Sequence, residues 1–255
     1  FEGTRRTWGY ACSPLAYKNM VIVFTGGKGA SIVALDQTTG GVVWKAHDFE
    51  NSFASPVLIQ VDGQTQLVCF MAKEVVGLDP DNGRLLWQHP HANQWRNNIS
   101  NPVWCEGNLL FISSEGHGGS RVLELTRSGG GTKVRELWAS RKMRISHRNA
   151  IRIGRCIYAS SGDFGPAPFT AVDVTNGRIA WQARGLAEAG AIFADGKLIL
   201  LDEDGHLALA TAAPESFTLH AKIKLLGREA WTIPTLVGRR LYLRDRKIIM
   251  ALELP

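Results

Sequence analysis

The feature that most constrains this chain is a repeated phrase: an apolar run, a polar turn with Asp and Gly, and a second apolar run that ends in Trp. The phrase stands at residues 32–44 and returns at 75–87 and 170–181. This order predicts a β-hairpin with an aromatic anchor. Because one hairpin cannot bury its own faces, self-similarity at a period of roughly 40 residues favours a β-propeller, a radial array of small sheets.

Weaker copies of the phrase stand at residues 122–138 and 207–219, and the chain ends inside another at 249–253. A second pair of apolar runs precedes each copy, so every repeat holds four predicted strands, A to D in chain order. We therefore predict an all-β fold, a β-propeller of four-stranded antiparallel blades with about six repeats. The predicted single domain spans residues 1–255, with units at approximately 12–45, 55–88, 101–139, 149–182, 189–222 and 231–255.

Length and composition agree with one globular domain. A chain of 255 residues can bury a large core, and its 27 glycines suit many turns. It has no apolar run of about 18 residues, so no transmembrane segment is expected. No stretch has the periodicity of a long amphipathic helix.

The spacing of Asp, Gly and Trp resembles the tryptophan-docking repeat of PQQ-like, quinoprotein-type β-propellers. Residues 8–14 and 230–245 resemble bacterial PQQ-binding-like repeat proteins of the cell envelope. The resemblance implies a periplasmic or other extracytoplasmic location. It also implies that Trp at the end of strand D stacks between blades while Asp and Gly shape the C-to-D turn. The positions that match are Asp36, Gly40, Trp44, Asp79, Gly83, Trp87, Trp138, Asp173, Gly177 and Trp181.

The last repeat ends at strand C, so its D strand must come from elsewhere if the ring closes. Residues 3–10 could supply it, which makes 1–11 a possible closing strand. An open blade would expose an edge strand that invites aggregation. The alternative is that the chain is part of a larger, eight-bladed ring. Because the chain opens inside a repeat without an initiator Met, we expect a fragment or a processed form.

Candidate binding residues lie on one face, where the D-to-A connections and the B-to-C turns project together; we call this the loop face. Polar and aromatic loops on a rigid scaffold are the usual place for binding. Arg and Asn there could hold a carboxylate, a quinone or a sugar, with Trp95 stacking over it. Residues 95–98 and 147–149 each stand immediately before a strand A and are therefore directed toward the central channel of the propeller. The alternative is that these side chains cap backbone groups and fill the channel, and that Lys73 forms a surface pair with Glu74. The candidates are Trp95, Arg96, Asn97, Asn98, His147, Arg148, Asn149, Lys73 and His117.

No metal site and no catalytic residue are predicted. Six of the seven histidines fall on the loop face, but no pair has a ligand spacing inside a regular element. Quinoprotein dehydrogenases of the resembling family use PQQ, a calcium ion, an Asp base and, in many members, a disulfide between adjacent cysteines. Here the cysteines are scattered in predicted strands as buried free thiols. They are Cys12, Cys69, Cys105 and Cys156.

The formal net charge is +6, from 29 basic and 23 acidic residues, which favours acidic partners. Aromatic residues are not interleaved with the basic runs, so nucleic acid is not favoured. We predict a non-catalytic binding or assembly module that contacts an envelope protein or a small acidic ligand and needs no cofactor. The alternative is a PQQ- and calcium-dependent dehydrogenase for alcohols or sugars, or a fragment of one.

Overall fold

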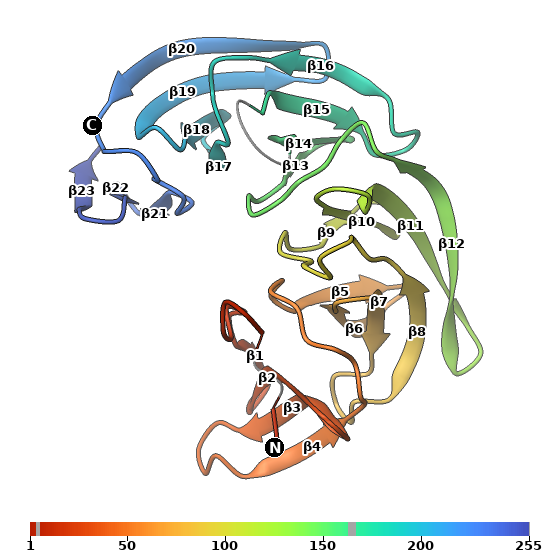
Figure 1. The fold of residues 1–255 in the computed structure, drawn as a ribbon. Helices are drawn as coiled ribbons and strands as arrows, with labels where there is room; N and C mark the ends of the chain where they lie inside the picture. The colour runs from red at the N-terminus through yellow and green to blue at the C-terminus, as the bar shows by residue number, and fades with distance from the viewer. Residues whose placement is uncertain (4–5, 163–166, 255) are drawn as a thin grey trace. The chain divides into compact units, whose positions relative to one another are not determined.

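The protein is built from antiparallel β-sheets, as Figure 1 shows for a computed structural model that describes residues 1–3, 6–162 and 167–254. Each sheet contains strands that follow one another in the chain. No helix occurs in these residues, and so none of the described segments is a helix that could cross a membrane. The chain divides into two compact units, Phe1–Arg141 and Lys142–Pro255.

Unit 1, Phe1–Arg141, holds three four-stranded sheets, which we call blades 1 to 3. Blade 1 consists of β1 (Leu15–Tyr17), β2 (Met20–Gly27), β3 (Ala30–Asp36) and β4 (Val42–Ala46). Blade 2 consists of β5 (Val57–Val61), β6 (Gln64–Phe70), β7 (Glu74–Leu78) and β8 (Leu85–Pro90). Blade 3 consists of β9 (Val103–Cys105), β10 (Leu109–Ser114), β11 (Gly119–Ser128) and β12 (Gly131–Ser140).

Unit 2, Lys142–Pro255, holds two four-stranded sheets and one three-stranded sheet, blades 4 to 6, in its described residues. Blade 4 consists of β13 (Ile151–Ile153), β14 (Cys156–Ser160), β15 (Phe169–Asp173) and β16 (Ile179–Ala183). Blade 5 consists of β17 (Gly190–Ala194), β18 (Lys197–Leu201), β19 (His206–Ala213) and β20 (Ser216–Lys224). Blade 6 consists of β21 (Thr235–Val237), β22 (Arg240–Arg244) and β23 (Ile249–Glu253).

The predicted fold class is confirmed: the described chain is all-β and forms about six propeller blades. The closing strand predicted within residues 1–11 is not formed by residues 1–3 and 6–11. Gly9 has a φ of 77° and its N–H donates to the Arg6 carbonyl at 2.9 Å, which bends this stretch into a turn. Residues 4–5 of that stretch lie outside the described residues, and closure of the ring stays a prediction.

The repeated phrase forms the hairpin between the third and fourth strands of a blade. Asp36 Oδ1 accepts hydrogen bonds from the N–H groups of Thr38 and Thr39 at 3.0 and 2.8 Å. Gly40 then takes a φ of 69°, in the left-handed region that favours glycine. Asp79 and Asp173 hold their turns in the same way, accepting from the N–H two residues further on. The polar half of the phrase is therefore a turn closed by its own side chain.

Each of these hairpins also carries a β-bulge at the same place. In blade 1 the register shifts between Ala34 and Leu35, and Ala34 is the residue paired with Trp44. The shift recurs beside the paired Trp in blades 2, 3 and 4 and at the equivalent point of blade 5. A bulge bends and twists the strand locally. The bulge therefore recurs directly beside the residue that pairs with the Trp of the outer strand.

The tryptophans of the phrase connect neighbouring blades. Trp44 donates from Nε1 to the Pro80 carbonyl of blade 2 at 3.0 Å, and its ring lies against Gly83, where a Cβ would come within 2.6 Å. Trp181 donates to the Ala213 carbonyl of blade 5 at 2.9 Å. The apolar cores follow the same plan, since each contains side chains from two successive blades.

Trp87 and Trp138 differ in detail. Trp87 Nε1 donates at 2.7 Å to Gln66 Oε1 of its own blade, and Gln66 Nε2 donates at 2.8 Å to Thr132 Oγ1 of blade 3. Trp87 thereby reaches the next blade through one glutamine. Trp138 is half-buried, and its ring centroid lies 6.2 Å from that of Phe111 in the same blade.

All four cysteines carry free thiols, but one prediction about them is wrong. Cys12 lies ahead of β1 rather than in a strand, and it is half-buried. Cys69, Cys105 and Cys156 lie in β6, β9 and β14 and are buried. Burial raises the pKa of the Cys12 thiol to about 11, which keeps it protonated and poorly nucleophilic at neutral pH.

Candidate functional site

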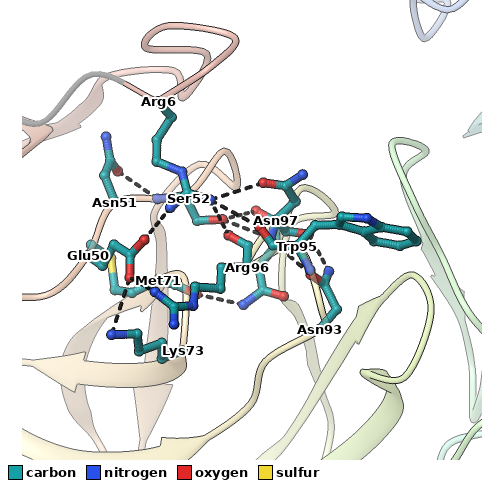
Figure 2. A network of polar contacts seen from close by, with 11 residues as sticks. Arg6, Glu50, Asn51, Ser52, Met71, Lys73, Asn93, Trp95, Arg96 and Asn97 are labelled. Carbon is teal, nitrogen blue, oxygen red and sulfur yellow. Dashed lines mark hydrogen bonds and ion pairs between the residues drawn. The ribbon is translucent and has the colours of Figure 1, made fainter.

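A cluster of charged side chains joins the loops of unit 1 (Figure 2). Its members come from the segment ahead of β1, the β4–β5 loop, the β6–β7 turn and the β8–β9 loop. We call Arg6, Lys73 and Arg96 around Glu50 the cation cluster. Sequence reasoning proposed Lys73 and Arg96 as binding residues and missed Arg6 and Glu50. No local signal marks Arg6, because its partners lie 44 to 91 residues away in the chain.

Glu50 is the centre of the cation cluster. Its Oε1 is paired with Arg6 Nη1, and its Oε2 lies 3.3 Å from both Lys73 Nζ and Arg96 Nη1. Partial burial by itself raises the pKa of Glu50, but the hydrogen bond from Lys73 and the charges of Arg6, Lys73 and Arg96 outweigh it and lower that pKa. Glu50 is therefore ionised at neutral pH, and three cations with one carboxylate carry a formal charge of +2.

Arg6 holds the cluster together. Besides its pair with Glu50, its Nη2 donates to the carbonyls of Trp95 and Arg96 at 3.2 and 3.0 Å and to Asn97 Oδ1 at 3.2 Å. Such a fork of fixed donors suits several acceptors at once. Lys73 and Arg96 differ from Arg6, because their side chains are 51% and 55% exposed. They are accessible cations, whereas Arg6 is a cross-link.

The β8–β9 loop is fixed by one buried side chain. Asn93 Oδ1 accepts from the N–H groups of Trp95 and Asn97, both at 3.0 Å, and Asn93 Nδ2 donates to the Asn97 carbonyl at 2.7 Å. Within this ring Arg96 takes a φ of 55°, a conformation that non-glycine residues adopt only where the surroundings impose it. The loop therefore presents Trp95, which is 43% exposed, and Arg96 in a set arrangement.

Asn98 is not on the surface, although we predicted it as a binding residue. It is fully buried, and its Nδ2 donates to the carbonyls of Met71 and His91 at 2.6 and 3.3 Å. Its backbone N–H and carbonyl both bond to Ser52 Oγ, at 2.7 and 2.8 Å. A buried amide engaged with the backbone of other loops is an architectural element. Its position gives it no access to a ligand at the surface.

His117 belongs to the same region of unit 1. It is exposed in the β10–β11 turn, and its backbone N–H donates to Gln94 Oε1 at 3.0 Å. Gln94 precedes Trp95 in the β8–β9 loop. The predicted residues Lys73, Trp95, Arg96 and His117 thus come from loops that contact one another.

The second predicted cluster lies in unit 2, ahead of β13, and is mostly internal. The Arg148 side chain is fully buried with its Nε 3.8 Å from Glu188 Oε2. In the described part of the chain no hydrogen-bond partner reaches its three nitrogens. Burial lowers the pKa of Arg148 to about 10, against the opposing charges of Glu188, Glu203 and Asp202. Arg148 was predicted as a binding residue directed toward the channel; the structure buries its side chain, which agrees better with the alternative, internal role.

The neighbours of Arg148 are also engaged inside unit 2. Asn149 Nδ2 donates to the Ala191 carbonyl at 2.7 Å, and its Oδ1 accepts from the Ala191 N–H at 3.1 Å, which ties blade 4 to blade 5. The His147 ring lies edge-on to Trp231 at 5.5 Å. Burial, and then the charge of Arg148, lower the pKa of His147 to about 4.

The pair His89 and His91 does not form a metal site with other ligands. His91 is buried with Nε2 2.8 Å from Ser114 Oγ, and burial followed by Arg121 and His89 lowers its pKa to about 3. His89 lies 3.5 Å from Glu136. In residues 1–3, 6–162 and 167–254 no three His, Cys, Asp or Glu side chains form a group that could hold a metal ion.

The residues of the cation cluster do not fit PQQ held with a calcium ion. Calcium prefers several carboxylate and carbonyl oxygens around one position. Glu50, the carboxylate at the centre, has both oxygens paired with cations. A calcium ion there would be repelled by the three cationic side chains, so this cluster does not suit calcium-dependent chemistry.

Comparison with known proteins agrees with the fold. The family model described as outer membrane protein assembly factor BamB matches residues 4–183. No curated protein sequence was found to match. The structure is similar to that of BamB from Moraxella catarrhalis, with a TM-score of 0.68 and 17% identity over 95% of this chain and 72% of that one.

Two further solved structures share the architecture. Quinohemoprotein alcohol dehydrogenase from Comamonas testosteroni matches with a TM-score of 0.61 and 11% identity over 98% of this chain, which spans 53% of that protein. The Cps50 (Swd1) β-propeller domain from Myceliophteria thermophila matches with a TM-score of 0.52 and 12% identity, over 96% of this chain and 86% of that one. At these identities the solved structures show only that the fold is shared, whereas the family model, which matches residues 4–183, shows the family of this chain. The chain belongs to the family of outer membrane protein assembly factor BamB, whose members are PQQ-repeat β-propellers.

Proposed function

We propose that this chain is a non-catalytic binding and assembly module that contacts a protein partner through the loop face of unit 1. The observation that carries the proposal is the cation cluster with Trp95 beside it. Lys73 and Arg96 are half exposed, and Trp95 is 43% exposed on the same fixed loop as Arg96. Trp and Arg are the residue types most enriched among the energetically dominant positions of protein interfaces.

The rigidity of the loop supports binding. Asn93 closes the β8–β9 loop, and Arg6 ties three of its residues to Glu50 of the β4–β5 loop. A side chain that is already held in place loses less conformational entropy when a partner binds. The surface therefore has the preorganisation that a recognition site needs.

The titratable groups of unit 1 support binding rather than catalysis. Glu50 has a lowered pKa and is paired with cations, so it is a weak general base. Ser114 and His91 form a hydrogen-bonded pair at 2.8 Å, but both side chains are buried and a substrate does not reach them. The accessible groups of these loops are the cations Lys73 and Arg96 and the indole of Trp95, which suit contact with a partner.

Membership of the BamB family supports an extracytoplasmic location, in the periplasm of the cell envelope. The partner we propose is accordingly an envelope protein. A charge of +6 on the whole chain agrees with a partner surface that is acidic.

The proposal can be tested by capture of partners from an envelope extract with the immobilised protein. The Trp95→Ala variant should no longer capture a partner that the unchanged protein captures, while its melting temperature should equal that of the unchanged protein. The matched control is Trp231→Ala, since Trp231 is 45% exposed and lies in unit 2. Equal retention by both variants would contradict the assignment to the loop face of unit 1.

The structural similarity to a quinohemoprotein alcohol dehydrogenase supports a second candidate, a PQQ-dependent dehydrogenase or a piece of one. A titration with PQQ and calcium, followed by tryptophan fluorescence and by reduction of an artificial electron acceptor, separates the two. For the binding module we expect no calcium-dependent quenching and no reduction. Saturable quenching that requires calcium would favour the dehydrogenase.

A further inference from the structure

We propose that the partner of the cation cluster is an acidic protein segment: its carboxylates contact Lys73 and Arg96, and a neighbouring apolar side chain contacts Trp95. This inference rests on the proposed function and adds the chemistry of the ligand. It follows from the charge of the cluster, the exposure of Lys73 and Arg96, and the different directions in which Arg96 and Trp95 point.

The charge of the cluster is only partly balanced. Arg6 uses one terminal nitrogen on Glu50 Oε1 and the other on three acceptors of the β8–β9 loop. Lys73 and Arg96 are left to share the single oxygen Oε2, each at 3.3 Å. Glu74 lies close enough to interact electrostatically with Lys73 and Glu50, so three cations and two carboxylates still leave an excess of one positive charge. The exposed side of the cluster therefore attracts a further anion.

A carboxylate is the anion that this geometry suits. Lys73 Nζ and Arg96 Nη1 approach the same oxygen, so the two cations lie within reach of a single second carboxylate. Arg96 has five N–H donors and uses Nη1 on Glu50. A planar guanidinium can bind a carboxylate through two parallel hydrogen bonds, while the Lys ammonium adds a point charge.

Trp95 makes a polypeptide the better occupant than a single small anion. Figure 2 shows its indole pointing away from Glu50 while the Arg96 side chain runs toward Glu50. The two adjacent residues thus offer an aromatic surface and a cation in different directions. A ligand that uses both must carry an acidic group and an apolar group some distance apart, as successive side chains of an extended peptide do.

The exposed cations near the loops of unit 2 do not offer the same excess. Arg228 lies 4.0 Å from Glu203 and 3.7 Å from Asp204, and Arg246 lies 2.9 Å from Glu229. Two cations there face three carboxylates. Neither of these two groups in unit 2 has the positive excess of the cation cluster, so charge complementarity favours the cation cluster over them for an acidic segment.

The test uses the whole chain and a synthetic probe, a blocked pentapeptide of four glutamates around one leucine, with the glutamine analogue as control. Fluorescence anisotropy should show binding of the acidic peptide at low salt and its loss at high salt. Lys73→Ala and Arg96→Ala should each weaken binding by about tenfold, the size expected for one charge-assisted contact. Lys133→Ala and Arg127→Ala are the matched controls, because both residues are exposed on or beside the β11–β12 hairpin turn.

Glu50→Gln gives the sharpest result. It keeps the shape of the side chain but removes the internal negative charge, so binding of the acidic peptide should strengthen several-fold. Circular dichroism and the melting temperature report whether the variant is folded. Unchanged affinity in Lys73→Ala, Arg96→Ala and Glu50→Gln together would overturn the proposal.

Two other outcomes separate this inference from the proposed function. If the peptide does not bind but capture of a partner still depends on Trp95, the acidic ligand is wrong and the binding module stands. If the peptide binds through Lys73 and Arg96 but capture is independent of Trp95, the ligand chemistry stands and the proposed partner surface is wrong. Binding of phosphatidylglycerol vesicles through the same cations, without peptide binding, would replace the peptide by a membrane.

Discussion

The loop ahead of β9 and the loop ahead of β13 carry similar residues but differ in burial. Arg96 is 55% exposed at the rim of unit 1, whereas the side chain of Arg148 is fully buried in unit 2. Arg96 precedes Val103, the first residue of β9, by seven positions, and Arg148 precedes Ile151, the first residue of β13, by three. In these two loops the same residue type is exposed where it stands farther from the first strand of its blade and buried where it stands nearer, so residue type alone does not decide accessibility.

The difference extends to the partners of each arginine. Arg96 shares a half-buried carboxylate, Glu50, with two other cations, while Arg148 lies opposite Glu188, which is fully inside the protein. A buried pair contributes mainly by keeping two internal charges compensated, and an exposed pair contributes little to stability. The loop with Arg96 is therefore the one proposed to recognise a partner, and the loop with Arg148 contributes to the internal structure of unit 2.

The largest expected effect is on Arg148. Arg148→Met removes the buried cation that lies opposite Glu188 and should lower the free energy of unfolding by about 3 to 5 kcal/mol, because it breaks a buried ion pair. Arg96→Ala, the comparison variant, should change it by about 0.5 kcal/mol or less. Urea unfolding of both variants measures the contrast. Equal losses for the two would show that burial does not separate these loops.

A smaller effect is expected within the β8–β9 loop itself. Asn98→Ala removes the donor to the buried carbonyls of Met71 and His91 and should cost about 1 to 3 kcal/mol. Asn97→Ala, one position nearer the rim, loses a contact with Arg6 and should cost less than about 1 kcal/mol. Thermal unfolding compares the two. A larger loss of stability for Asn97→Ala than for Asn98→Ala would contradict the assignment of Asn98 as the more important structural residue.

The smallest effect is a dependence of stability on pH. The pKa of His147 is lowered from 6.5 to about 4, so the folded protein favours the neutral imidazole and the unfolded chain binds the proton more readily. Its contribution to stability is complete above pH 6.5 and is lost as pH falls from 6.5 to 4. Burial and the charge of Arg148 are the causes of the shift.

His147→Phe keeps an aromatic ring against Trp231 and removes the titration. We expect the loss of stability between pH 6.5 and 4 to become shallower in this variant, as followed by urea unfolding at several pH values. His91, with a pKa lowered to about 3 by burial, Arg121 and His89, should retain the remaining slope. An unchanged slope would mean that His147 is not protected from protonation in the folded state.

Much of the fold could be predicted because the repeated phrase is local. Asp36 closes its turn through N–H groups two and three residues away, and Gly40 supplies the left-handed backbone that follows. Each of these interactions lies within one hairpin, so the sequence alone contains it. The strands, their antiparallel order and the positions of the tryptophans follow from that pattern.

The site could be predicted only in part. Lys73, Trp95 and Arg96 could be proposed from the sequence because they stand in loops on the predicted face, where polar and aromatic residues are plausible binding groups. Glu50 lay in such a loop without being distinguished from its neighbours. Arg6 was missed, since it was assigned to a closing strand. For Asn98 and Arg148 the sequence left binding in the channel and an internal role both open, because a sequence does not state how deep a loop residue lies.

The sequence by itself determined the β-hairpins, the blades and the tryptophans of the outer strands in blades 1 to 4, because alternation, turn chemistry and repeat length act over short distances along the chain. The tertiary structure decided which loop residues meet and which are buried. Arg6 reaches Glu50 across 44 residues and Asn97 across 91, and Arg148 faces Glu188 across the boundary between two blades. Those contacts depend on how successive blades pack, and packing brings together side chains whose spacing in the sequence carries no signal.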